Sequence, residues 1–110
     1  FLRPLGLRLP SGITGLETSL ALGITELVDA GYLTMKQLLR LMSTNPAAMY
    51  HLDAEYLAEG GPADVILIDT AAEFIPETYA SKATNTPFTG WKLKGEVKKT
   101  ICGGKMVYEA

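Results

Sequence analysis

Histidine and cysteine are nearly absent from this sequence, which has one of each, His51 and Cys102, among 110 residues. A single cysteine excludes an internal disulfide and fits a reducing cytoplasm, where we expect the protein to be found. Neither His-x-His nor Cys-x-x-Cys occurs, so the spacing that usually marks a zinc centre is missing. We therefore predict no metal-ligating and no catalytic residue in this chain.

The sequence also lacks an excess of positive charge and any long apolar run. Ten Lys and Arg residues stand against twelve Asp and Glu residues, for a net charge of −2. Without a net positive field or a basic stripe, we expect neither nucleic acid nor an anionic membrane as a partner. The longest apolar run is far too short to cross a bilayer, and Pro4, Gly6 and Arg8 interrupt any signal-peptide core near the start. A length of 110 residues suits one small domain.

Apolar spacing predicts helices in the first half of the chain. One helix is expected from about Thr14 to the Gly31 stop, because apolar residues recur there at helical intervals. The residues on that face are Leu16, Leu20, Ile24, Leu27 and Val28.

A second helix is marked by Thr34 and Gln37, which have the spacing of a capping box. Asn45, a favoured N-cap, and Pro46, favoured at the first helical position, predict a third, short helix that runs to about Tyr50.

The second half has the pattern of strands. Residues 65–68 are apolar and mostly β-branched, which predicts a strand buried on both faces and bounded by Asp64 and Asp69. Near the end, Gly103-Gly104 predicts a two-residue hairpin loop. The strand before that loop is expected to alternate strictly, with Trp91, Leu93, Val97 and Ile101 on one face.

This order predicts an α+β fold with a helical first half and a β-rich second half. We expect an irregular lead-in at residues 1–12, a helical segment at 13–58 and a β segment at 59–110. A hairpin and one further strand leave bare edges, and bare edges pair with other chains. We therefore expect a homo-oligomer that forms through the open sheet edge or the helices.

Few single residues are candidates for a site. His51 is interpreted as a helix-end residue and Cys102 as an ordinary strand residue. Asp64 and Asp69 are interpreted as strand-end markers, since residues five apart on a strand lie too far from each other for joint acid–base work. Ser11 and Gly12, in a Pro-Ser-Gly turn before a helix, could present backbone amides to a carboxylate, although a plain turn is the alternative reading.

Several stretches together resemble dihydroorotases, members of the cyclic amidohydrolase superfamily. Pro-Ser-Gly-Ile-Thr-Gly-Leu-Glu-Thr is similar to the loop and helix start that follow the last barrel strand of those enzymes. Thr-Asn-Pro-Ala is similar to a segment found across the superfamily. The matching stretches are residues 10–18, 44–47, 63–69, 85–90 and 95–108.

The resemblance implies the end of a TIM-barrel amidohydrolase together with the late strands of its flanking β-sandwich. It implies a zinc-dependent enzyme that interconverts dihydroorotate and N-carbamoyl-aspartate in pyrimidine synthesis, with Ser11 and Gly12 touching the substrate. The family's metal ligands lie upstream of the matched stretches, and residues 1–9 lack the aspartate and histidine of its last barrel strand. We therefore expect a carboxy-terminal part of a dihydroorotase that is inactive alone. The alternatives are a fragment of an allantoinase-type enzyme and a non-catalytic oligomerisation module.

Overall fold

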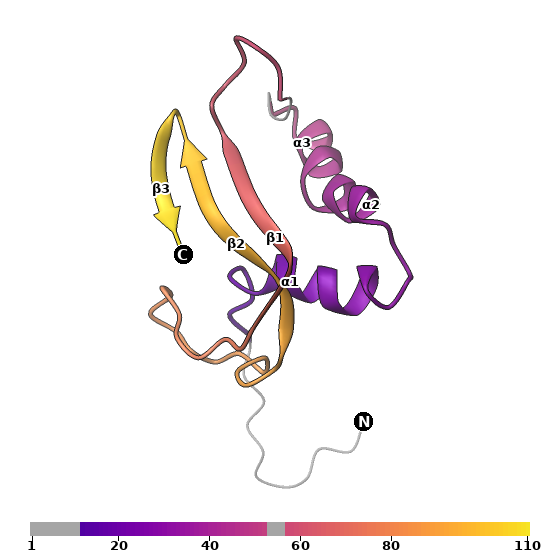
Figure 1. Ribbon diagram of the computed structural model, residues 1–110, viewed down its shortest axis with the longest axis vertical. Helices are drawn as coiled ribbons and strands as arrows, with labels where there is room; N and C mark the ends of the chain where they lie inside the picture. The colour runs from indigo at the N-terminus through magenta and orange to yellow at the C-terminus, as the bar shows by residue number, and fades with distance from the viewer. Residues whose placement is uncertain (1–11, 53–56) are drawn as a thin grey trace, which may run out of the picture.

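Two continuous helices followed by a three-stranded antiparallel sheet make up the described part of the chain, residues 12–52 and 57–110 of the computed structural model (Figure 1). The predicted α+β class is therefore confirmed. The boundaries at residues 13–58 and 59–110 remain an interpretation, and nearly all of the 1–12 lead-in lies outside the described residues.

The first helix begins later than its apolar spacing predicts. Its α-helical part, α1, spans Ser19–Gly23 and continues as a π-helical segment, η1, over Ile24–Val28. Residues 16–18 form a turn in which the Thr18 N–H donates to Gly15 O at 3.3 Å, so the predicted start at Thr14 is wrong. Gly31 ends the helix with a positive φ of 83°, as predicted.

The second helix has the predicted capping box. In α2 (Met35–Leu39) the Gln37 N–H donates to Thr34 Oγ1 at 3.2 Å, and the Thr34 N–H donates to Gln37 Oε1 at 2.8 Å. Each side chain thus satisfies a backbone donor that the helix itself leaves unpaired.

The helix predicted from Asn45 to about Tyr50 is present as α3, but it continues the second helix without a break. The segments η2 (Arg40–Thr44) and α3 (Asn45–Met49) continue from α2, and Asn45 is itself helical (φ −68°, ψ −45°), with its N–H donating to Arg40 O. The N-cap prediction for Asn45 was therefore wrong. Pro46 lacks an N–H and its ring crowds the carbonyl four residues earlier, a conflict that the wider π-helical turns before it relieve.

The sheet has the order β1-β2-β3, with β1 at Val65–Phe74, β2 at Leu93–Cys102 and β3 at Lys105–Glu109. Both loop glycines of the β2–β3 hairpin have positive φ, 55° at Gly103 and 76° at Gly104, as the two-residue turn requires. The alternation predicted for β2 is interrupted, because the β1–β2 register passes from Leu67↔Lys99 to Ile68↔Val97 and leaves Lys98 as a bulge residue.

Strand β1 differs from its prediction in length and burial. It continues past Asp69 to Phe74, so Asp69 lies inside the strand and does not mark its end. Ile66 and Leu67 are 46% and 50% exposed, so the prediction of a strand buried on both faces is wrong for the described residues. Side chains on both faces of β1 therefore remain open to solvent.

The core lies where the first helix crosses β2 (Figure 1). Ile24 and Leu93 are almost completely buried there, together with Ala21. Gly95 permits the close approach, because a Cβ at this position would overlap the Ile24 side chain, and its φ of 92° favours glycine as well. The two helices also approach each other closely at a glycine. A Cβ added to Gly23 would lie only 2.8 Å from Leu38 Cδ1.

Candidate functional site

Residues 12–15, named here the Gly12 turn, have no helix or strand structure and are held by a loop more than seventy residues further along the chain. Asn85 Nδ2 donates to Gly12 O at 2.8 Å, and the Thr14 N–H donates to Asn85 O at 3.4 Å. Gly12 is exposed, and its Cβ position has no described atom within 4 Å. The other predicted site residue, Ser11, lies outside the described residues.

A second contact fixes the same segment. The two carboxylate oxygens of Glu17 accept from successive backbone amides, Oε2 from the Ala80 N–H at 2.9 Å and Oε1 from the Ser81 N–H at 3.0 Å. Hydrogen bonds to a charged acceptor are stronger than neutral ones. The segment from Gly12 to Glu17 is therefore attached to the 80–85 loop at both ends, which also explains why Glu17 does not sit in the first turn of a helix.

The loop between β1 and β2, residues 75–92, closes on itself. Tyr79 Oη and Thr89 Oγ1 are 2.8 Å apart, and the Gly90 N–H donates to Pro76 O at 3.3 Å. Phe88 and Trp91 pack edge to face, with ring centroids 5.3 Å apart. These contacts give the Gly12 turn an ordered surface to rest on.

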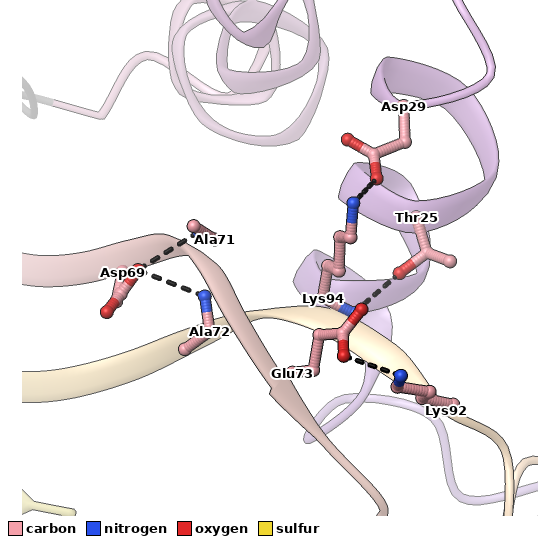
Figure 2. Close-up of polar contacts among 8 residues, drawn as sticks. All are labelled: Thr25, Asp29, Asp69, Ala71, Ala72, Glu73, Lys92 and Lys94. Atoms are coloured by element: carbon pink, nitrogen blue, oxygen red, sulfur yellow. Dashed lines mark hydrogen bonds and ion pairs between the residues drawn. The ribbon is translucent and has the colours of Figure 1, made fainter.

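Polar contacts also join the first helix to the sheet (Figure 2). The Lys94 N–H donates to Thr25 Oγ1 at 2.8 Å, and Lys94 Nζ lies 2.6 Å from Asp29 Oδ2. The hydrogen bond that Lys94 donates to Asp29, followed by the negative charge of Asp29, raises the pKa of Lys94 above its usual 10.5. Lys92 and Glu73 form a separate exposed pair at 2.6 Å. Lys94 is thus paired with Thr25 and Asp29 across the junction between helix and sheet, which is a structural role.

The remaining titratable candidates also have structural surroundings. His51 follows the second helix with a φ of 55°, which agrees with its interpretation as a helix-end residue, and Cys102 is the last residue of β2. Asp64 Oδ1 accepts from the Gly103 N–H at 2.6 Å and so supports the hairpin turn. Asp69 Oδ1 accepts from the Ala71 and Ala72 N–H groups at 3.0 Å each, at an irregularity of β1 that Figure 2 shows.

No group of three or more His, Cys, Asp and Glu side chains suited to a metal ion occurs in residues 12–52 and 57–110. The donor set that the structure describes therefore does not fit the zinc centre that the resemblance implies. Within the same ranges, every helix is too short or too polar to cross a membrane.

The sequence did not single out Asn85 or Glu17 as residues that act on the Gly12 turn. Their contacts span 73 and 63 residues of sequence, so no local spacing reveals them. The one available signal was that residues 10–18 and 85–90 both belong to the stretches that resemble dihydroorotases.

Comparison with known proteins gives two results. The family model described as "Amidohydrolase family" matches residues 9–107. A dihydroorotase of Lactococcus lactis is 55% identical over 102 residues, which is 92% of this chain and 24% of the relative. A dihydroorotase of Streptococcus pyogenes serotype M3 is 59% identical over 100 residues, 90% of this chain and 24% of the relative. The chain thus spans about a quarter of the length of the curated relatives that it matches.

Proposed function

Because this chain belongs to the amidohydrolase family, we propose that it is the carboxy-terminal part of a dihydroorotase. The observation that supports this most strongly is the identity of 55–59% to dihydroorotases over 100–102 residues. The Lactococcus lactis and Streptococcus pyogenes relatives are both dihydroorotases, which favours dihydroorotate over allantoin as the proposed substrate.

The proposed reaction is the reversible hydrolysis of dihydroorotate in pyrimidine synthesis. Water adds to a ring amide carbonyl, the ring C–N bond breaks, the carbonyl becomes a carboxylate and the released nitrogen takes a proton, which gives N-carbamoyl-aspartate. The role proposed for this chain is to present the backbone of Ser11 and Gly12 to the substrate. The anchoring of Gly12 by Asn85 supports this, because an exposed turn must be held in place before it can bind a ligand.

For the complete enzyme, and not for this chain, we propose a zinc centre. Its ligands would come from other parts of a complete dihydroorotase, since the described residues of this chain do not fit such a centre. We therefore propose that the chain alone neither hydrolyses dihydroorotate nor binds zinc stoichiometrically.

The surfaces that the described residues leave open support a role in assembly. Strands β1 and β3 each have an unpaired side in the three-stranded sheet, and Met106, Val107 and Tyr108 of β3 are half exposed or more. We propose that these edges and the exposed helix faces contact the remainder of a cytoplasmic enzyme or a second copy of it.

A chimera tests the proposed function. The segment of the Lactococcus lactis dihydroorotase that matches this chain is replaced by this chain, and hydrolysis of dihydroorotate is compared with that of allantoin. We expect a chimera that hydrolyses dihydroorotate and leaves allantoin intact. The isolated chain, dialysed against zinc, serves as the control and should hold no stoichiometric metal. A folded but inactive chimera, or tight zinc in the isolated chain, would overturn the proposal.

A further inference from the structure

Two side chains outside the Gly12 turn determine its orientation. We propose that Asn85 and Glu17 are positioning residues that hold this turn for substrate binding, an inference that rests on the proposed function. Asn85 acts on Gly12 and Thr14, while Glu17 fixes the other end of the segment on the loop at Ala80.

Asn85 contacts this segment through two hydrogen bonds. Its side-chain amide donates to Gly12 O at 2.8 Å, and its backbone carbonyl accepts from the Thr14 N–H at 3.4 Å. Two bonds to residues two apart fix both the position and the rotation of the peptide units between them. The described chain has no cis peptide, so the Ile13 N–H points away from the Gly12 carbonyl and from Asn85. The face of the turn opposite Asn85 is thereby left with a backbone donor.

Among the described residues, no atom lies close to the Cβ side of Gly12 or Gly15. A Cβ at Gly12 would have no described atom within 4 Å, and neither would one at Gly15. Thr14 Oγ1, between these two glycines, is buried and has no hydrogen-bond partner among the described residues. The two hydrogen bonds of Asn85 are therefore the described long-range contacts that fix Gly12 itself, while Glu17 fixes the other end of the segment.

The Glu17 contact depends on a carboxylate. Its two oxygens each accept one N–H, from Ala80 at 2.9 Å and Ser81 at 3.0 Å. A glutamine would keep one acceptor and turn an NH₂ group toward the other N–H, so only one bond would survive. Asparagine at position 85 is equally specific, since an aspartate of the same shape cannot donate to Gly12 O and would place a negative charge against it.

The test uses the active chimera described above with Asn85→Asp and Glu17→Gln as the variants. Lys82→Ala is the matched control, because Lys82 is exposed in the same loop and makes no side-chain hydrogen bond or ion pair among the described residues. A misplaced binding turn weakens substrate binding more than the chemical step, so we expect KM for dihydroorotate to rise roughly tenfold and kcat to change less than about twofold. Lys82→Ala should leave both constants unchanged.

The outcomes separate this inference from the proposed function. An inactive, folded, unsubstituted chimera overturns the proposed function and the positioning roles with it. An active chimera whose variants keep the parent KM, or lose only kcat and thermal stability, overturns the positioning roles alone, because a merely structural contact changes the amount of folded enzyme and leaves KM unchanged. A rise in KM without a matching fall in kcat supports them.

Discussion

Two residues hold equivalent positions after the two helices, and only one of them is a glycine. At Gly31, the Gly31 N–H donates to Val28 O and the N–H of the next residue to Leu27 O. At His51, the same pair of bonds runs to Ala48 and Ala47. Both residues have the left-handed φ that this helix ending requires, 83° and 55°. A residue with a Cβ is strained there by about 1 kcal/mol.

We therefore expect His51→Gly to raise the free energy of unfolding by about 1 kcal/mol, and Gly31→Ala to lower it by about the same amount. No described atom lies within 4 Å of a Cβ at Gly31, so we expect the effect there to be conformational and not steric. Urea denaturation of the two variants measures both changes. A loss of stability in His51→Gly would show that the imidazole makes a contact that outweighs the strain.

Gly12 presents the opposite case, because nothing in the described residues requires a glycine there. No described atom lies within 4 Å of its Cβ position. Gly12→Ala should therefore change the stability of this chain by less than about 0.5 kcal/mol. In the chimera, the same methyl group should obstruct the substrate and lower kcat/KM. Parallel urea denaturation and activity measurements check the two expectations, and an unchanged kcat/KM would argue against a substrate contact at Gly12.

At the scale of the elements, features with local causes could be predicted and features with distant causes could not. The Thr34 capping box and the Gly103-Gly104 turn were predicted correctly because each depends on residues within three positions of each other. The predicted start of the first helix was wrong because the Glu17 carboxylate accepts hydrogen bonds from backbone N–H groups 63 and 64 residues away. The partners of Gly12 were missed for the same reason.

The crossing of the first helix over β2 predicts a large effect of one methyl group. Gly95→Ala would push a Cβ into Ile24 and force alanine into a φ of 92°, so we expect a loss of about 2–3 kcal/mol in the free energy of unfolding. Ile24→Val removes Cδ1, the nearest atom, and should recover part of that loss in the double variant. A double-mutant cycle by urea denaturation measures the coupling, and strictly additive effects would contradict the overlap.

The Lys94–Asp29 pair ties that helix to the sheet in a pH-dependent way. The pKa of Lys94 is raised in the folded state, so its contribution to stability is complete below the usual value of 10.5 and disappears as the pH rises through the folded value. We expect Asp29→Asn to reduce the alkaline loss of stability, measured as the urea midpoint below and above pH 10.5. The pKa of Lys98 is raised as well, mainly by its hydrogen bond to Glu96, so some alkaline loss should remain. An unchanged alkaline loss would contradict the assignment to Lys94.

For the molecule as a whole, exposed apolar residues lie together on one side of the helices among the described residues. The groove between the two helices is lined mainly by apolar residues, Leu22, Leu27, Leu38, Leu41 and Met42, together with Gly23, Ser19 and Glu26. Leu41 is 55% exposed and Met42 is 41% exposed. Exposed apolar residues that lie together usually mark an interface. The spacing of apolar residues in the sequence predicts which helix faces are apolar. It does not identify the surface against which those faces pack.

If the remainder of a dihydroorotase covers that groove, the two pieces should recognise each other as separate chains. We expect dihydroorotase activity when this chain is co-expressed with a Lactococcus lactis enzyme that lacks the matching quarter, and none from either piece alone. Leu41→Glu should abolish the activity, because the partner would have to bury an unpaired charge in an apolar contact. Lys36→Glu, also exposed on the second helix and outside the groove, is the matched control and should retain it. Equal activity of both variants would show that this groove does not face the rest of the enzyme.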